Sequence, residues 1–176
     1  MTVITETDRL ILREIVPADA SFLHALLTDA DFLANIGDRG VKTVEDAEIA
    51  IRDRYGAAYA KQGFGMWAVE GKADGVPLGM AGLVNRDGLD DIDIGYAFLP
   101  AARGRGYALE AARAVMALAR EKGIAPVVAI VNAGNAKSIA VLEAIGLVAD
   151  RPVRLPGADH DVMLYVSGDE AATPVP

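Results

Sequence analysis

Ala102-Arg103-Gly104-Arg105-Gly106-Tyr107-Ala108 lies between an apolar stretch that ends at Pro100 and a long alanine-rich stretch. This order is typical of a strand that is followed by a turn and a helix. The first N–H groups of a helix have no acceptor within the helix, and glycine allows another molecule to approach them closely. The segment therefore predicts an anion-binding turn at a helix N-terminus.

Two common phosphate-binding motifs do not fit this turn. A P-loop needs four residues between its glycines and then Gly-Lys-Ser or Gly-Lys-Thr, and the chain contains no such string. A dinucleotide-binding turn would need a small residue where Leu109 stands and an acid after the next strand, and the run that ends at Val131-Asn132 has neither. We therefore expect neither a P-loop nucleotide site nor a nicotinamide cofactor.

The pattern on either side of the turn indicates an α/β fold. Three strands separated by short reversals precede it and predict an antiparallel meander, and the run 127–131 has the unbroken apolar character of a strand buried on both faces. The expected strands are 9–15, 64–70, 77–85, 91–99, 127–131, one from 147 and one around 162–166. The expected helices begin near 17, 43, 107 and 136, and Thr43 is expected to cap the second.

Composition predicts one globular domain and limits its partners. The chain has 176 residues, of which 52% are hydrophobic, and we expect residues 1–167 to form the domain and 168–176 a disordered tail. A formal net charge of -8 argues against nucleic-acid binding. The absence of cysteine and the presence of only two histidines argue against a metal site. No apolar run is long enough to cross a membrane and the N-terminus does not resemble a signal peptide, so we expect a cytoplasmic protein.

Two ordered motifs resemble the Gcn5-related N-acetyltransferase (GNAT) family. Residues 103–108 resemble its pyrophosphate loop, Arg/Gln-x-x-Gly-x-Gly/Ala. Asn135-Ala136-Lys137-Ser138 resembles its Asn-x-x-Ser segment, and residues 141–147 resemble its "Leu-Glu-x-Leu-Gly-Phe" helix ending. The opening residues 7–13, together with Ile94-Gly95-Tyr96, are similar to the ribosomal-protein N-terminal acetyltransferase (RimJ/RimL-like) branch.

The resemblance implies a GNAT fold of class α/β (α+β), with acetyl-CoA as cofactor. It implies a mixed, mostly antiparallel sheet of about six or seven strands, flanked by about four helices and splayed between the fourth and fifth strands. The pantetheine arm of the cofactor would lie in that gap, against the strand backbone. The expected cofactor-binding residues are Tyr96, Ala97, Phe98, Arg103, Gly104, Arg105, Gly106, Tyr107, Ala108 and Asn135.

The resemblance also implies direct acetyl transfer to a primary amine, with two candidate catalytic residues. Ser138 would protonate the departing thiolate, although helix capping is an alternative role for both Asn135 and Ser138. Alternation places Asp93 and Gly95 on one face of a strand, and Asp93 occupies a position where the family often has glutamate. Asp93 would act as general base or attract a cationic amine, and a solvated strand face is the alternative reading of its position.

The acceptor is less well defined. Trp67 and Tyr165 are candidate substrate-contacting residues, with core packing as the alternative for Trp67. An α-amine with a pKa near 8 is neutral in about one molecule in ten at pH 7, which favours the N-terminal α-amine of a peptide or protein, or a small amine, over lysine side chains. The alternatives are a non-catalytic CoA-binding or sensing module and an enzyme that modifies an antibiotic or another small amine. The acyl group can be longer than acetyl, and the exposed edges of such a fold permit a homodimer.

Overall fold

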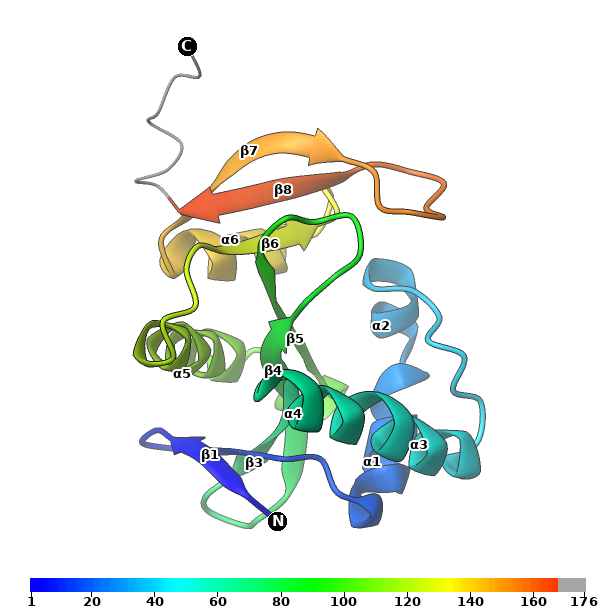
Figure 1. Ribbon diagram of the computed structural model, residues 1–176. Coiled ribbons are helices and arrows are strands. Elements are labelled where there is room, and N and C mark those ends of the chain that lie inside the picture. Colours follow the sequence, from blue (N-terminus) through cyan, green and yellow to red (C-terminus); the bar gives the residue numbers. More distant parts are fainter. Residues whose placement is uncertain (168–176) are drawn as a thin grey trace.

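The computed structural model describes residues 1–167, in which eight strands form one mostly antiparallel sheet in the order β1-β2-β3-β4-β5-β6-β8-β7 (Figure 1). The expected tail, 168–176, lies outside the described residues. The strands are β1 (Val3–Glu6), β2 (Leu10–Arg13), β3 (Met66–Gly71), β4 (Pro77–Val84), β5 (Ile92–Phe98), β6 (Val127–Val131), β7 (Leu147–Val153) and β8 (Val162–Ser167).

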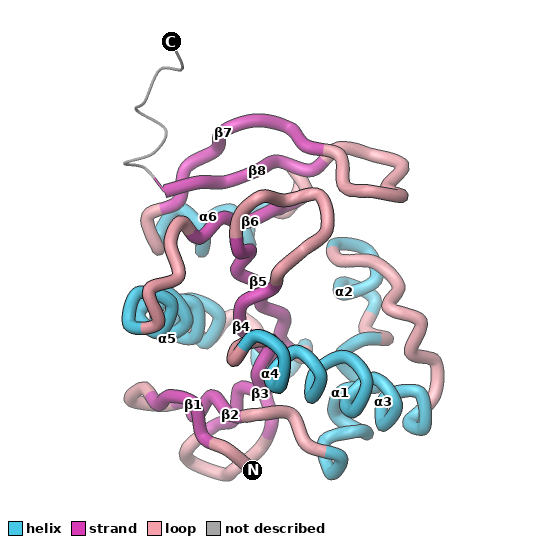
Figure 2. Tube along the Cα trace, in the orientation of Figure 1, coloured by secondary structure: helices cyan, strands magenta, loops and turns pink. Residues whose placement is uncertain are grey.

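Helices cover both faces of the sheet (Figure 2). They are α1 (Ala20–Leu27), α2 (Ala30–Asn35), α3 (Val44–Ala50), α4 (Ala57–Gln62), α5 (Tyr107–Glu121) and α6 (Ala136–Ala144). A π-helical segment, η2 (Ile51–Gly56), joins α3 to α4, and short 3-10 turns lie at η1 (Pro17–Asp19) and η3 (Pro100–Ala102). None of the helices within residues 1–167 has the length and apolar character needed to span a membrane.

Two hydrophobic clusters lie on opposite faces of the sheet. Val69 and Leu83 pack with Val115 of α5 on one face, whereas Ala68 packs with Leu23 of α1 on the other. This division follows from strand alternation, since Ala68 and Val69 are neighbours on β3. The α5 face of the core also includes Leu142 of α6, so α5 and α6 form one layer and α1, α3 and η2 form the other.

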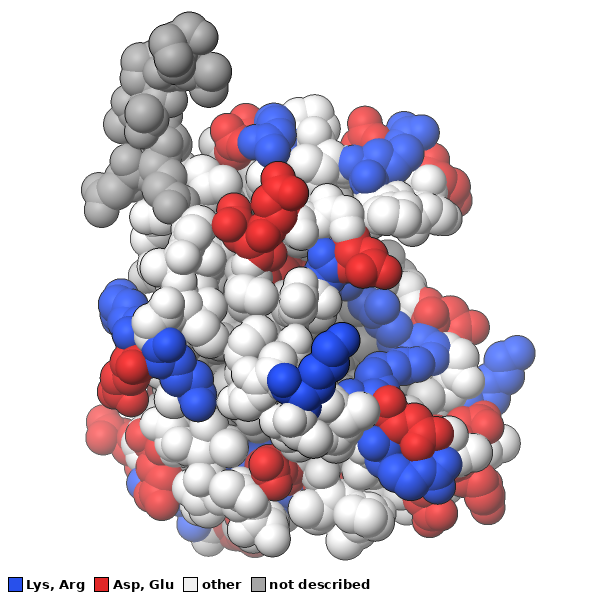
Figure 3. Space-filling model, in the orientation of Figure 1, with Lys and Arg blue, Asp and Glu red and all other residues white. Residues whose placement is uncertain are grey.

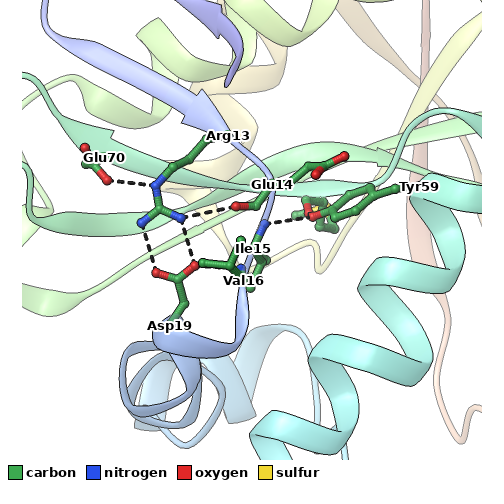
Figure 4. Close-up of polar contacts among 8 residues, drawn as sticks. Arg13, Glu14, Ile15, Val16, Asp19, Tyr59 and Glu70 are labelled. Atoms are coloured by element: carbon green, nitrogen blue, oxygen red, sulfur yellow. Dashed lines mark hydrogen bonds and ion pairs between the residues drawn. The ribbon is translucent and has the colours of Figure 1, made fainter. Parts of the chain in front are cut away.

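A buried ion-pair network fixes the start of the α1 layer to the sheet (Figure 4). Both terminal nitrogens of Arg13 bind Asp19, at 2.8 and 2.9 Å, and its Nε donates to Glu70 at 2.7 Å. The same Asp19 carboxylate accepts a hydrogen bond from the Val16 N–H at 2.8 Å. Arg13 on β2 therefore connects η1, which precedes α1, to Glu70 on β3.

The sequence predicted most elements, with three omissions. The strand at Val127–Val131 and the cap at Thr43 are confirmed, the latter as a full capping box with Asp46. β1 was missed because it is a short edge strand without a buried face, so the splay expected after the fourth strand lies after β5. α2 and the π-helical turn were also missed; α2 has only six residues, and side-chain contacts from a distant loop hold it in place.

Candidate active site

The glycine-containing loop leads directly into α5. Gly104 and Gly106 have φ values of +73° and +78°, a left-handed conformation that L side chains adopt only with strain. Gly106 is the N-cap of α5, and it has no side chain that could accept a hydrogen bond from the first turn. The first helical hydrogen bond of α5 runs from the Glu110 N–H to the Gly106 carbonyl. The preceding N–H groups of the turn are thus available to an anion, and the helix dipole favours negative charge there.

The N-terminal hairpin holds this loop in place. Arg9 donates from Nε to Glu110 at 2.7 Å and from Nη1 to the Arg105 carbonyl at 3.0 Å. Its guanidinium also lies 4.6 Å from the centre of the Tyr107 ring. Thr7 adds a hydrogen bond of 2.5 Å to Glu110. The first turn of α5 is therefore fixed in orientation before any ligand binds.

The two arginines of the loop differ in their surroundings. Arg103 donates to the Phe98 carbonyl at 2.9 Å and forms ion pairs with Asp29 and Asp31 at the start of α2. Its guanidinium is thus engaged in joining the loop to α2, and a role of Arg103 toward phosphate would use its backbone. Arg105 is exposed.

β5, the strand that leads into the loop, runs parallel to β6, and a gap opens between the two strands close to the start of β5. β5 and β6 are paired only at Ile92 with Val127 and at Asp93 with Val128. Beyond these positions β6 pairs with β8 instead, and β5 keeps only β4 as a strand neighbour within residues 1–167. The free edge of β5 runs through Tyr96, Ala97 and Phe98, where an extended amide-containing arm can bond as a strand would.

A hydroxyl pair links β5 to the start of α6. Tyr96 Oη lies 2.9 Å from Ser138 Oγ and donates to the Ser138 carbonyl at 3.0 Å. The single proton of the Tyr96 hydroxyl is used on the Ser138 carbonyl, which can only accept. The Ser138 hydroxyl is therefore the donor in the contact between the two hydroxyls. Burial raises the pKa of Tyr96 to about 12, against the effect of the Ser138 hydrogen bond, so the phenol keeps its proton at neutral pH. Asn135 caps α6 by accepting from the Ser138 N–H at 3.2 Å, which confirms capping as one role for this residue.

Asp93 lies on the face of β5 opposite to Tyr96, at the point where β5 and β6 begin to separate. Its side chain is 1% exposed, so the alternative of a solvated strand face is wrong. Arg86 Nε donates to Oδ2 at 2.7 Å, while Oδ1 is buried without a hydrogen-bond partner in the described part of the chain. Burial raises the pKa of Asp93 to about 6, although the charge and hydrogen bond of Arg86 act to lower it. Asp93 is thus an ionised but unusually basic carboxylate at neutral pH.

The two residues expected to contact substrate lie in the core. Trp67 is 1% exposed and Tyr165 is 5% exposed, and both pack in the cluster on the α5 face. Neither side chain offers a surface to an acceptor, so the structure contradicts their expected role. Met66, the neighbour of Trp67 on β3, points to the opposite face of the sheet and approaches Gly95, two residues from Asp93.

Sequence reasoning missed Arg86, the partner of Asp93. The sequence predicts only a reversal between strands at Arg86-Asp87-Gly88. The β4–β5 pairing places Val84 opposite Asp93 and leaves Arg86 two residues further along, a position that no sequence motif marks.

Comparisons with known proteins agree with this arrangement. The family model described as "Acetyltransferase (GNAT) domain" matches residues 9–148. The uncharacterized protein YkkB of Bacillus subtilis (strain 168) is 31% identical over 152 residues, which cover 84% of this chain and 87% of that protein.

Solved structures share the fold at lower identity. A putative GNAT-family acetyltransferase from Bordetella pertussis superposes with a TM-score of 0.76 at 24% identity, over 96% of this chain and 100% of that one. A ribosomal-protein-S5-alanine acetyltransferase from Vibrio fischeri has a TM-score of 0.75 at 18% identity, over 97% and 98% of the two chains. Because the family model covers most of the chain, the chain belongs to the GNAT family of acetyltransferases, which take their acetyl group from acetyl-CoA.

Proposed function

We propose that this acetyltransferase moves the acetyl group directly to a primary amine at the β5–β6 gap, with Asp93 as general base and Ser138 as general acid. The observation that carries the proposal is the position of the gap: it begins at buried Asp93 and is bordered by the Tyr96 and Ser138 hydroxyls. Asp93 and Tyr96 are three residues apart on one strand, or about 10 Å. Donor and acceptor would thus meet at the free edge of β5.

The donor is proposed to lie along this edge. The loop 103–108 would bind the pyrophosphate through its backbone N–H groups, and Asn135 would contact the cofactor near the start of α6. The backbone of Tyr96, Ala97 and Phe98 would hold the pantetheine arm and polarise the thioester carbonyl. Such donors stabilise the oxyanion that develops as the carbonyl is attacked.

The reaction then needs two proton transfers. The neutral amine attacks the thioester carbonyl, a C–N bond forms, the C–S bond breaks and CoA leaves as a thiolate. Because Asp93 is only 1% exposed, it would take the proton of the amine through a water molecule, and Ser138 would supply a proton to the thiolate. A carboxylate with a pKa of about 6 is a better base than an ordinary aspartate and is still ionised at pH 7.

The acceptor is proposed to be an α-amine of a peptide or protein, or a small amine of similar basicity. The similarity of residues 7–13 and Ile94-Gly95-Tyr96 to the RimJ/RimL-like branch supports an N-terminal α-amine. An α-amine also asks less of the base than a lysine side chain does, because its pKa is lower by more than two.

The test is acetyl transfer by a matched pair of variants, Ser138→Ala and Lys137→Ala. Purified protein is incubated with acetyl-CoA and a panel of short peptides and small amines, and CoA release and acetylated product are both measured. Ser138→Ala should lower kcat by about tenfold or more while acetyl-CoA still raises the Tm. Lys137→Ala, which changes an exposed neighbour, should leave kcat unchanged. A protein that binds acetyl-CoA but acetylates no amine would be a CoA sensor, and the proposal would fail.

A further inference from the structure

Two arginines from separate segments lie close enough to Asp93 for their charges to act on it, and a third arginine contacts one of them. Arg39 lies in the connection between α2 and α3, Arg54 in η2 and Arg86 between β4 and β5. Arg54 Nη2 donates to the Arg39 carbonyl at 3.3 Å, and Arg86 binds Asp93 at 2.7 Å. Figure 3 shows Lys and Arg side chains around a hollow right of centre, in the region where Figure 1 places these segments.

Only one of the three arginines has a carboxylate partner. Within residues 1–167, Asp93 pairs with Arg86, while Arg39 and Arg54 form no ion pair. Two aspartates line a groove of about 310 Å³ together with Arg39 and Arg54, but both are engaged elsewhere. Asp46 accepts hydrogen bonds from the backbone N–H groups of Lys42 and Thr43, and Asp53 pairs with Arg52. Ion pairs offset the charges of Asp53 and Arg86, which leaves Arg39 and Arg54 against the single carboxylate of Asp46 and thus a small excess of positive charge in a protein whose net charge is -8.

The excess charge is partly withdrawn from solvent. Arg39 is half-buried, and burial lowers its pKa, with the charges of Arg86 and Arg54 adding to the effect. Close cations in a partly desolvated site repel one another, and a bound anion would relieve that repulsion. Arginine is also the side chain best suited to carboxylate and phosphate, because its planar fork donates two parallel hydrogen bonds.

The Asp93 carboxylate provides the second half of a site. Its Oδ1 is enclosed by the protein and the carboxylate lies near the backbone of Ile130 on β6, so an amine in the hollow would exchange a proton with Asp93 through a water molecule. A ligand that carries both an amine group and an oxyanion matches this pattern of one basic carboxylate and two arginines without a carboxylate partner. A neutral amine would leave both arginines unpaired.

Contacts at the end of β6 limit the size of the ligand. Asn132, which follows β6, donates to the Asn35 carbonyl of α2 at 3.2 Å, and its Oδ1 lies 3.3 Å from His160 Nε2 in the β7–β8 connection. These bonds join three segments that border the gap on the acceptor side. They favour a compact acceptor over a long polypeptide.

We propose that the acceptor is a small amine that bears an oxyanion, a carboxylate or a phosphate, and that Arg39 and Arg54 bind this group while the amine faces Asp93. This inference rests on the proposed function and specifies its substrate class. Asp93 remains the base, and the arginines set specificity through KM more than through kcat.

The test compares matched acceptors with and without an oxyanion. One pair is the amide of glycyl-aspartate and the amide of glycyl-asparagine, which share an α-amine, and the other is O-phosphoethanolamine and ethanolamine, which reports on phosphate. The anionic member of at least one pair should have a kcat/KM about tenfold higher or more. Arg39→Gln and Arg54→Gln should remove this preference by raising KM. Lys61→Gln, an exposed cation on α4 that lies outside the groove, should retain it.

Binding is measured separately from turnover, so that the two proposals can fail independently. Inorganic phosphate is added to protein already saturated with CoA, which occupies the donor loop, and the Tm is recorded. A phosphate-dependent rise in wild type and Lys61→Gln that is absent from Arg39→Gln supports the site even if none of these amines is acetylated. Equal kcat/KM for charged and neutral members, or acetylation of long polypeptides alone with no phosphate effect, would overturn the inference while leaving acetyl transfer itself intact.

Discussion

The loop at residues 103–108, the proposed donor side, offers mainly backbone N–H groups, whereas the hollow across β5, the proposed acceptor side, offers side chains that come from three separated segments. The donor side is therefore encoded in one continuous string with glycine at the positions that need it. The acceptor side is encoded in single residues, such as Arg39 and Arg86, whose neighbours in sequence carry no pattern. A backbone site tolerates side-chain changes but not changes of conformation, and a side-chain site has the opposite sensitivity. The four substitutions below test this difference.

The largest effect is expected at Asp93, where the two sides meet. Asp93→Asn should lower kcat/KM by about 10²-fold or more, because a general base contributes typically 10²–10⁴-fold. In the wild type, kcat/KM should rise with pH through about 6, as the carboxylate ionises, and this limb should be absent from the variant. Initial rates between pH 5 and 8 measure both. A wild-type profile that is flat through pH 6 would assign the base elsewhere.

Stability provides the control for this substitution. The pKa of Asp93 is raised from 3.8 to about 6, so the folded state favours the protonated carboxyl. That favourable contribution is complete below pH 3.8 and is lost as the pH rises through about 6, by at most ~3 kcal/mol. Relative to wild type, Asp93→Asn should thus be more stable at pH 8 than at pH 4. A variant that is inactive yet more stable at pH 8 has lost chemistry and not its fold.

The next effect concerns the support of the acceptor side. Arg13→Ala should lower the free energy of unfolding by about 3–5 kcal/mol, because it leaves the Asp19 carboxylate buried without its partner. Urea unfolding at pH 7 measures the loss. The matched control is Arg154→Ala, which removes an exposed ion pair with Asp161 and should cost about 1 kcal/mol or less. Similar losses for both variants would mean that the buried network does not hold η1 to the sheet.

The same contrast explains what the sequence could predict. The donor loop, the strand at Val127–Val131 and the cap at Thr43 depend on local conformation, and local patterns predicted them. α2 was not predicted because it has only six residues; Asp29 caps it locally by accepting from the Phe32 N–H, and the same carboxylate is also held by Arg103, more than 70 residues away.

Burial was the second source of error. Trp67 and Asp93 are only 1% exposed, and alternation along a strand shows which residues share a face without showing whether helices cover that face. The partner of Asp93 was similarly hidden, since Arg86 is placed by the hairpin register and not by a motif.

The donor side should be sensitive to backbone conformation. Gly106→Ala places a Cβ on a residue with φ of +78°, which costs about 1–2 kcal/mol and shifts the N–H groups proposed to bind the pyrophosphate. Acetyl-CoA affinity should fall about tenfold or more, as measured by calorimetric titration. Gly123→Ala is the control, since Gly123 has φ of +69° at the other end of α5 and should lose similar stability without losing affinity. Equal affinities for the two variants would remove the loop from the cofactor site.

The smallest effect is expected from the exposed arginine of the same loop. Arg105→Gln removes a charge but leaves the backbone of the turn unchanged, so acetyl-CoA affinity should fall by about threefold or less at 0.15 M salt. This small loss, set beside the larger one for Gly106→Ala, would show that backbone groups bind the pyrophosphate and that the arginine contributes only a screened attraction. The difference between wild type and Arg105→Gln should then shrink further as salt is raised to 0.5 M. A loss above tenfold that persists at high salt would instead show a side-chain clamp on the phosphates, and the donor and acceptor sides would then be built by the same means.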